Sequence, residues 1–506
     1  MNQLQSRLLV DSHRAVKLRL SVLRVTFGSR PILLGLANAL KNLGSGAAGR
    51  LFSALLGVLL AIYMARKWSV DAFGQYSIVF NYFQLLQQAP LLGLHILLAR
   101  DAAARPDDRR SEMVTAGSLG LVVSVPLAFG LGLIGQFLYP SDLHASFALV
   151  GVSLAPTALI LVIEMILIGQ ERLSFVAFIN ILESALRFIV FITLIYFGAR
   201  LTEIILAFVA LRFVTLFFYL FDRKTFILLQ PSAFRPTLLL QLLKQAPILF
   251  SILILSTVFS RIDVTFLSKM ASDANVAIYS IAARLYDLAL IVPGVLIMVL
   301  LPILSRLHAK NPDAVLQLCK LVLRYGLIVG APAAICMSFA ARPIITLVFG
   351  EKFAAAELPV QILMCATLVM GANQLMATVL LVFNLQRFDL VALTAGCLAL
   401  VGGLLSLIPS LGINGAALAA FSGAITQCVA RIFIIHAKLS LNIVVWDLFG
   451  PLLASMSMVA GMYLAAQRPL LVIPVGLITY AVALRLSRSI SFSDINLVKQ
   501  LVASGK

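Results

Sequence analysis

Apolar runs of about 20 residues recur along nearly the whole chain, with short connections between them. A helix of that length spans the hydrocarbon core of a bilayer, which is roughly 30 Å thick. Because no water reaches this core, a spanning segment must satisfy its backbone hydrogen bonds internally, and a helix does so. The 506 residues therefore accommodate on the order of fourteen spanning helices and little else.

The apolar runs predict an all-α polytopic membrane protein with about fourteen transmembrane helices. The composition agrees, because 61% of the residues are hydrophobic and only 12% are charged. This excludes a soluble enzyme, and no predicted outer connection exceeds roughly 12 residues, which leaves no room for a catalytic domain there. The spans begin near Leu43, Phe73, Met113, Ser146, Val176, Ile204, Pro247, Val276, Leu321, Leu358, Leu390, Asn414, Val444 and Leu470.

The basic residues are distributed unequally between the two sides of the membrane. With the N-terminus inside, 26 of the 39 Lys and Arg residues lie in cytoplasmic segments and six lie outside, which is a positive-inside pattern. The even number of spans then puts both termini in the cytoplasm. Because the basic residues sit mostly in short connections, nucleic acid is not an expected partner. The six outer residues are Arg66, Lys67, Arg200, Lys269, Lys352 and Arg468.

No motif indicates a cofactor, a metal site or nucleotide hydrolysis. The five cysteines and five histidines are scattered without CxxC or HExxH spacing, so we expect no metal and no cofactor. A Walker A loop is absent, so the chain is not expected to hydrolyse ATP itself. The segments with GxGxxG spacing that begin at Gly44 and Gly130 lie in apolar spans, where small residues favour close helix packing.

Two short internal matches indicate a repeat. Tyr76–Ile78 matches Tyr279–Ile281 at an offset of 203, and Gly169–Arg172 matches Asn384–Arg387 at an offset of 215. Both matches shift the chain by six spans, so we predict two parallel six-helix lobes around a central cleft, plus two C-terminal helices. The predicted divisions are a basic cytoplasmic arm (1–42), an N-lobe (43–222), a C-lobe (223–440), the last two helices (441–488) and a cytoplasmic tail (489–506).

Ionisable residues inside the predicted spans are the main candidates for function, because each costs roughly 2.5–3.5 kcal/mol near the bilayer centre. If four arginines face the cleft, they form a cationic site suited to phosphate or pyrophosphate: Arg50, Arg212, Arg261 and Arg284. Four carboxylates would carry a coupling proton or sodium ion, or orient those arginines: Glu164, Glu183, Asp263 and Asp287. Polar residues of the second span, Asn81, Gln84 and Gln88, would contact sugar hydroxyls or form interhelical hydrogen bonds.

The spacing of these charges leaves structural alternatives open. Glu183 with Arg187, at i,i+4, and Arg284 with Asp287, at i,i+3, could each form an ion pair on one helix face. Arg261 and Asp263 point about 200° apart around a helix and cannot pair comfortably. Two further arginines, Arg342 and Arg431, lie near span ends, where we expect their side chains to snorkel towards the membrane surface.

Several segments together resemble the multidrug/oligosaccharidyl-lipid/polysaccharide exporter superfamily, and within it the Wzx-type polysaccharide flippases. The resemblance extends from about Asn38 onward. The residues that carry it are 70–77 (VDAFGQYS) leading to Gly93 and Arg100, 261–267 (RIDVTFL), 277–282 (AIYSIA), 348–353 (VFGEKF) and 411–417 (LGINGAA).

The resemblance implies a non-enzymatic flippase in the bacterial inner membrane. Its substrate would be an undecaprenyl-pyrophosphate-linked oligosaccharide repeat unit for O-antigen, capsule or exopolysaccharide, moved from the cytoplasmic to the outer leaflet by alternating access. Membrane lipids, a polymerase and a chain-length regulator would be its partners, and H⁺ or Na⁺ its coupling ion. The alternatives are a flippase of the peptidoglycan lipid precursor, an ion-coupled multidrug antiporter, and a membrane glycosyltransferase or polymerase.

Overall fold

The computed structural model describes residues 49, 51–94, 98, 110–222, 234–439, 446–465 and 469–487. Within these residues the chain is helical and contains no strand. Ten helical segments are long and apolar enough to cross a membrane. They are α5 (Arg110–Leu138), α6 (Ser141–Val152) with α7 (Leu154–Gly169), α8 (Leu173–Tyr196), α9 (Leu201–Phe221), α11 (Pro236–Met270), α12 (Asp273–Lys310), α13 (Pro312–Phe339), η3 (Glu351–Ala356) with α15 (Glu357–Val382), α16 (Gln386–Leu411) and α17 (Ile413–Leu439).

Four further helices of the described residues lie where the remaining spans are predicted. They cover residues 51–67, α3 (Val70–Leu86), α18 (Trp446–Leu464) and α19 (Pro469–Leu486). Two of them, α18 and α19, contain shorter apolar helices. The largest differences in start are at α11, which begins at Pro236 instead of near Pro247, and at α13, which begins at Pro312 instead of near Leu321. The first turns of both helices mix apolar with polar residues, such as Lys244 in α11 and Asp313 in α13, so a search for continuous apolar runs places the start of each helix too late.

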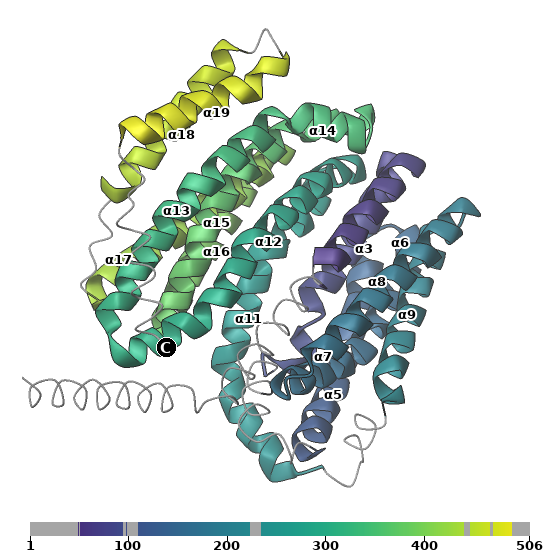
Figure 1. Cartoon of the computed structure of the whole chain (residues 1–506). Helices are drawn as coiled ribbons and strands as arrows, with labels where there is room; N and C mark the ends of the chain where they lie inside the picture. The colour runs from purple at the N-terminus through teal and green to yellow at the C-terminus, as the bar shows by residue number, and fades with distance from the viewer. Residues whose placement is uncertain are drawn as a thin grey trace, which may run out of the picture.

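The helices form two bundles (Figure 1). The first bundle consists of the helices between residues 51 and 222, and the second of those between residues 234 and 439. The pair α18 and α19 packs outside the second bundle, against α13. Two short helices follow longer ones: η1 (Ala89–Leu91) follows α3, and α14 (Ala341–Val348) follows α13.

The capping and turn geometry supports the internal repeat. Ser69 caps α3 by accepting from the Ala72 amide, and Ser272, 203 residues later, caps α12 by accepting from the Asn275 amide. The α7–α8 and α15–α16 turns also correspond, with positive φ at Glu171 (60°) and Asn384 (58°). The offset between these two turns is therefore 213 rather than 215, so the second match identified the right turn in a register two residues off.

The bundles meet along α3, which packs against α11 and α12. A Cβ on Gly74 would lie 2.0 Å from the Asp273 carbonyl oxygen, so only glycine permits this approach. Gln75 Nε2 donates to Asp273 Oδ2 at 3.2 Å. Asn81 Nδ2 donates to the Arg261 carbonyl and to Thr265 Oγ1, both at 3.1 Å. Asn81 thus makes the interhelical hydrogen bonds that were one of its two predicted roles.

Contacts between the bundles also close one end of the molecule, where α3 and α12 begin and α5, α11 and α14 end. We call this the closed end. The rings of Phe73 and Phe353 meet edge to face there, 6.0 Å apart. Tyr139 and Ser268 share a hydrogen bond of 2.7 Å between their hydroxyl oxygens. The α3 interface therefore continues to the surface at this end.

The α16–α17 hairpin offers a matched test of close helix packing. A Cβ at Gly415 would lie 2.2 Å from the Leu407 carbonyl oxygen, whereas Gly402 has nothing within 4 Å. Gly415→Ala should therefore lower the free energy of unfolding by about 1–3 kcal/mol. Gly402→Ala should leave it unchanged or raise it by up to about 1 kcal/mol. Denaturant titration of the purified protein in mixed micelles measures both, and equal effects would contradict the packing described here.

Candidate functional site

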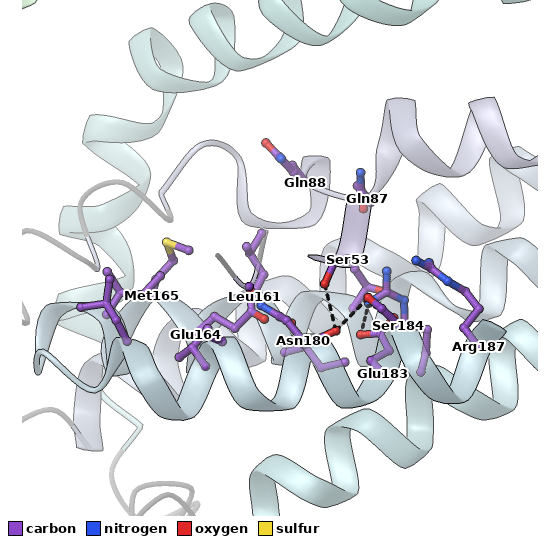
Figure 2. Close-up of a pocket in the computed structure, with 18 of the residues that line it drawn as sticks. Ser53, Gln87, Gln88, Leu161, Glu164, Met165, Asn180, Glu183, Ser184 and Arg187 are labelled. Carbon is purple, nitrogen blue, oxygen red and sulfur yellow. Dashed lines mark hydrogen bonds and ion pairs between the residues drawn. The ribbon is translucent and has the colours of Figure 1, made fainter. Parts of the chain in front are cut away.

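A cavity of about 420 Å³ lies within the first bundle (Figure 2). The first helix, the two residues that follow α3, and helices α7, α8 and α9 line it, and Met298 of α12 adds one side chain from the second bundle. Its polar lining residues are Ser53, Gln87, Gln88, Thr157, Glu164, Asn180, Glu183, Ser184, Arg187 and Arg212. The cavity is thus a polar space inside helices that are otherwise apolar.

One stripe of α8 supplies much of this polarity. Asn180, Glu183, Ser184 and Arg187 stand at positions i, i+3, i+4 and i+7, so they share one helix face. Figure 2 shows these side chains along a single side of the helix. Ser184 Oγ donates to the Asn180 carbonyl at 2.8 Å, and Ser53 Oγ reaches the same carbonyl at 3.3 Å. The serine of the first helix thereby links that helix to α8.

Glu183 pairs with Arg212 of α9, at 3.3 Å. Arg212 also lies 5.3 Å from the ring centroids of Phe83 and Phe208. Its Nε is buried and has no hydrogen-bond partner among the described residues. The i,i+4 pair of Glu183 with Arg187 is not formed, and within the described part of the chain Arg187 has no carboxylate partner. Arg187 therefore lines the cavity with its charge uncompensated by an ion pair of the described residues.

Glu164 of α7 accepts a hydrogen bond of 2.9 Å from the hydroxyl of Tyr219 on α9. Tyr219 is completely buried. Sequence reasoning did not select Tyr219, Asn180 or Arg187 as site residues. A tyrosine hydroxyl within an apolar span could have identified Tyr219, because such a group needs a partner.

The other predicted charges form a separate group on α11 and α12. Arg261 pairs with Asp287 at 2.9 Å, so the predicted i,i+3 pair of Arg284 with Asp287 gives way to a cross-helix pair. Asp263 accepts from the Tyr279 hydroxyl at 2.6 Å, in agreement with the prediction that it cannot pair with Arg261. The Arg284 guanidinium lies 5.8 Å from the Phe73 ring centroid.

The structure thus does not bring the predicted arginines into one chamber. Arg212 lines the cavity of the first bundle. Arg261 and Arg284 do not line this cavity, and they lie on α11 and α12, which pack against α3. Arg50 lies outside the described residues. Of the predicted sugar contacts, Gln88 lines the cavity, and Gln84 is half-buried outside its lining.

The prediction that Arg431 snorkels is wrong. Only 4% of this residue is exposed. Its guanidinium donates to Asp389 Oδ1 at 2.7 Å and to the carbonyl and side-chain oxygens of Asn373 at 3.1 and 3.0 Å. Arg431 therefore joins three helices of the second bundle. Arg342 does extend to the surface, with 63% of its side chain exposed.

A family model described as polysaccharide biosynthesis protein matches residues 39–308, just over half of the chain. The chain belongs to this family. No curated protein sequence matches it significantly.

Solved structures show the fold. A structure of the lipid II flippase MurJ in an inward closed conformation is similar with a TM-score of 0.70 at 13% identity, over 87% of this chain and 97% of that one. A MOP superfamily transporter from Pyrococcus furiosus gives 0.61 at 14% identity, over 79% and 96%. The Vibrio cholerae MATE transporter VcmN in its bent form gives 0.56 at 16%, over 79% and 97%. The chain is therefore a multi-pass membrane protein with the fold of this transporter superfamily, as the sequence predicted.

The cross-helix pairing of Glu183 can be tested with a double-mutant cycle. Glu183→Gln and Arg212→Gln should show a coupling free energy of about 1–3 kcal/mol, because their side chains are in contact and only 10% and 13% exposed. Glu183→Gln and Arg187→Gln, the matched cycle on one helix, should be additive within about 0.5 kcal/mol. Unfolding in mixed micelles gives both values. A larger coupling free energy for Glu183 with Arg187 than for Glu183 with Arg212 would contradict the cross-helix pair and support the pair on one helix.

Proposed function

We propose that this protein is a flippase for undecaprenyl-pyrophosphate-linked oligosaccharide repeat units in the bacterial inner membrane. It moves them from the cytoplasmic to the outer leaflet by alternating access, for the synthesis of a surface polysaccharide. The family and the transporter fold support a flippase-type transporter. The observation that carries the finer proposal is the polar cavity lined mainly by the membrane-spanning helices of the first bundle.

The chemistry of the cavity suits a glycan attached to a phosphate. Sugar hydroxyls require many donors and acceptors, and the lining supplies amides, hydroxyls and carboxylates. A volume of about 420 Å³ lies within the range of ligand pockets, roughly 300–1,000 Å³. Arg187, without a carboxylate partner, and the unpartnered Nε of Arg212 offer guanidinium donors, which favour phosphate oxygens.

The distribution of basic residues supports an orientation for the protein. Arg66, Lys269 and Lys352 belong to the few cations that the positive-inside count assigns to the outer side, and all three lie at the closed end. In our proposal this end faces outward, both termini are cytoplasmic, and the described conformation is shut towards the outside. A coupling proton or sodium ion would act through Glu164 or Glu183. The polymerase and chain-length regulator would receive the transported unit.

The fold similarity to MurJ supports a second candidate, a flippase of the peptidoglycan lipid precursor. Mass spectrometry of undecaprenyl-linked sugars, resolved by leaflet, in cells depleted of this protein separates the candidates. Accumulation of a complete oligosaccharide on the cytoplasmic leaflet, with loss of the surface polymer, is the expected result. Accumulation of lipid II identifies the second candidate. Unchanged lipids with altered drug sensitivity indicate an antiporter, and unpolymerised units on the outer leaflet indicate a polymerase.

Arg187→Gln should reduce glycan export by on the order of tenfold, because the charge-assisted hydrogen bond to the substrate is lost. Arg187→Lys keeps the charge and should retain part of the export. The matched control is Arg306→Gln at the exposed end of α12, where the guanidinium donates to Pro302 of its own helix. Surface polysaccharide is measured in complemented depletion cells at equal protein levels. Full export by Arg187→Gln would remove Arg187 from the substrate site.

A further inference from the structure

Three basic side chains at the closed end donate to backbone carbonyls of the opposite bundle. Arg66, in the last turn of the first helix, donates from Nε to the Val348 carbonyl at 2.8 Å and from Nη2 to the Leu347 carbonyl. In the opposite direction, Lys352 of the second bundle donates to the Trp68 carbonyl of the first bundle at 2.7 Å. Lys269, in the last turn of α11, donates to the Leu138 carbonyl.

The acceptors lie where helices end. Leu138 is the last residue of α5, Val348 is the last residue of α14, and Trp68 directly follows the first helix. The final carbonyls of a helix lack partners within it and carry the negative end of its dipole. A cation is favoured at each of these positions, even though no carboxylate takes part.

The two sets of contacts are related by the internal repeat. Lys269 follows Arg66 by 269 − 66 = 203 residues, the same offset that separates the capping serines Ser69 and Ser272. The acceptors Leu138 and Val348 are 210 residues apart. This value lies between the repeat offset of 203 at the capping serines, which come earlier in the chain, and the offset of 213 at the positive-φ turns, which come later. Each bundle therefore contributes a cation from the end of its first helix. Each bundle also provides a backbone carbonyl that accepts the hydrogen bond from the other bundle's cation. In the first bundle this carbonyl is at the end of the third helix, α5, and in the second bundle it is at the end of α14, which follows the third helix, α13.

Neighbouring aromatic groups support the second contact. The Lys269 ammonium lies 3.1 Å from the centroid of the Tyr139 ring. The Tyr139 hydroxyl is hydrogen-bonded to Ser268, the residue before Lys269, and contacts the Tyr82 hydroxyl at 3.2 Å. Lys269 is thus held between a helix terminus and a ring of the first bundle.

We propose that these contacts form two symmetry-related latches that set how often the closed end opens. The first latch comprises Arg66 and Lys352 with the carbonyls of Trp68, Leu347 and Val348, and the second comprises Lys269 with the Leu138 carbonyl and the Tyr139 ring. The inference rests on the alternating access of the proposed function, in which the outer end must open once per cycle. Opening separates the bundles at this end and breaks both latches together.

A buried position in the interface between the bundles reports opening directly. Ser77 is 6% exposed and shares a face of α3 with Gly74 and Asn81, which contact α12 and α11. Ser77→Cys, in the full chain with its five native cysteines replaced by alanine, should react with a water-soluble maleimide only when the closed end opens. When opening is fast compared with labelling, the labelling rate measures the open population.

In proteoliposomes without substrate, Arg66→Gln and Lys269→Gln should each raise the labelling rate about two- to fivefold. Together they should raise it on the order of tenfold, because the two sites are independent. Lys67→Gln, an exposed cation next to Arg66 with no contact to the second bundle among the described residues, should label at the original rate. Arg66→Lys with Lys269→Arg keeps both charges and should also remain slow.

An unchanged rate in the double glutamine variant would overturn the proposal. So would equally fast labelling of the charge-conserving pair or of Lys67→Gln. A monodisperse profile in size-exclusion chromatography and an unchanged melting temperature show that faster labelling does not come from unfolding. Because the assay contains no substrate, its result is independent of the leaflet measurement: the latches can hold in a transporter of another cargo, and the flippase can operate without them.

Discussion

A charged side chain within the bilayer is stabilised by a partner of opposite charge inside the protein, and in this fold three such pairs join neighbouring helices. Glu183 pairs with Arg212 between α8 and α9, Arg261 pairs with Asp287 between α11 and α12, and Asp389 pairs with Arg431 between α16 and α17. Each pair ties two consecutive helices together and fixes how they are rotated about their axes. The rotation of α8 that lets Glu183 meet Arg212 also directs the rest of its polar stripe into the cavity. The site thus depends on the pairing.

The two bundles contain a corresponding ion pair in different surroundings. In both, the fifth helix supplies the acid and the sixth supplies the arginine. In the second bundle the pair lies near the start of α16, and Asn373 of α15 accepts two further hydrogen bonds from Arg431. In the first bundle the pair lies in the middle of α8, beside a cavity, and Arg212 keeps a buried donor without a described partner. Related frames therefore give one arginine, Arg431, that makes three hydrogen bonds to described residues, and one, Arg212, that keeps a buried Nε donor available to a ligand.

The sequence predicted the helical transporter fold and the correspondence between its two bundles, because hydropathy and short repeated motifs are local properties. It did not predict the charge partners. The i,i+4 spacing allowed Glu183 to pair with Arg187. Whether a carboxylate pairs with an arginine of its own helix or of a neighbouring helix depends on how closely the helices pack, and spacing along one helix carries no information about that distance. For the same reason Arg431 was expected at the surface, although Asp389 and Asn373, 42 and 58 residues earlier, surround it. Gln88, Glu164, Glu183 and Arg212 do line one cavity, so part of the candidate site followed from the rarity of polar groups in apolar spans.

The strength of these interactions differs within and between the bundles. Within each bundle one ion pair is largely buried: Arg212 and Glu183 are 13% and 10% exposed, and Arg431 and Asp389 are 5% and 16% exposed. Removing one partner of such a buried pair costs several kcal/mol. Between the bundles, the latch cations Arg66, Lys269 and Lys352 are exposed and donate to neutral carbonyls, each stabilising the closed end by about 0.3–1 kcal/mol. A transporter that alternates between two states needs bundles that stay rigid and an interface that separates readily. Buried pairs inside the bundles, together with weak cation contacts between them at the closed end, would provide that combination.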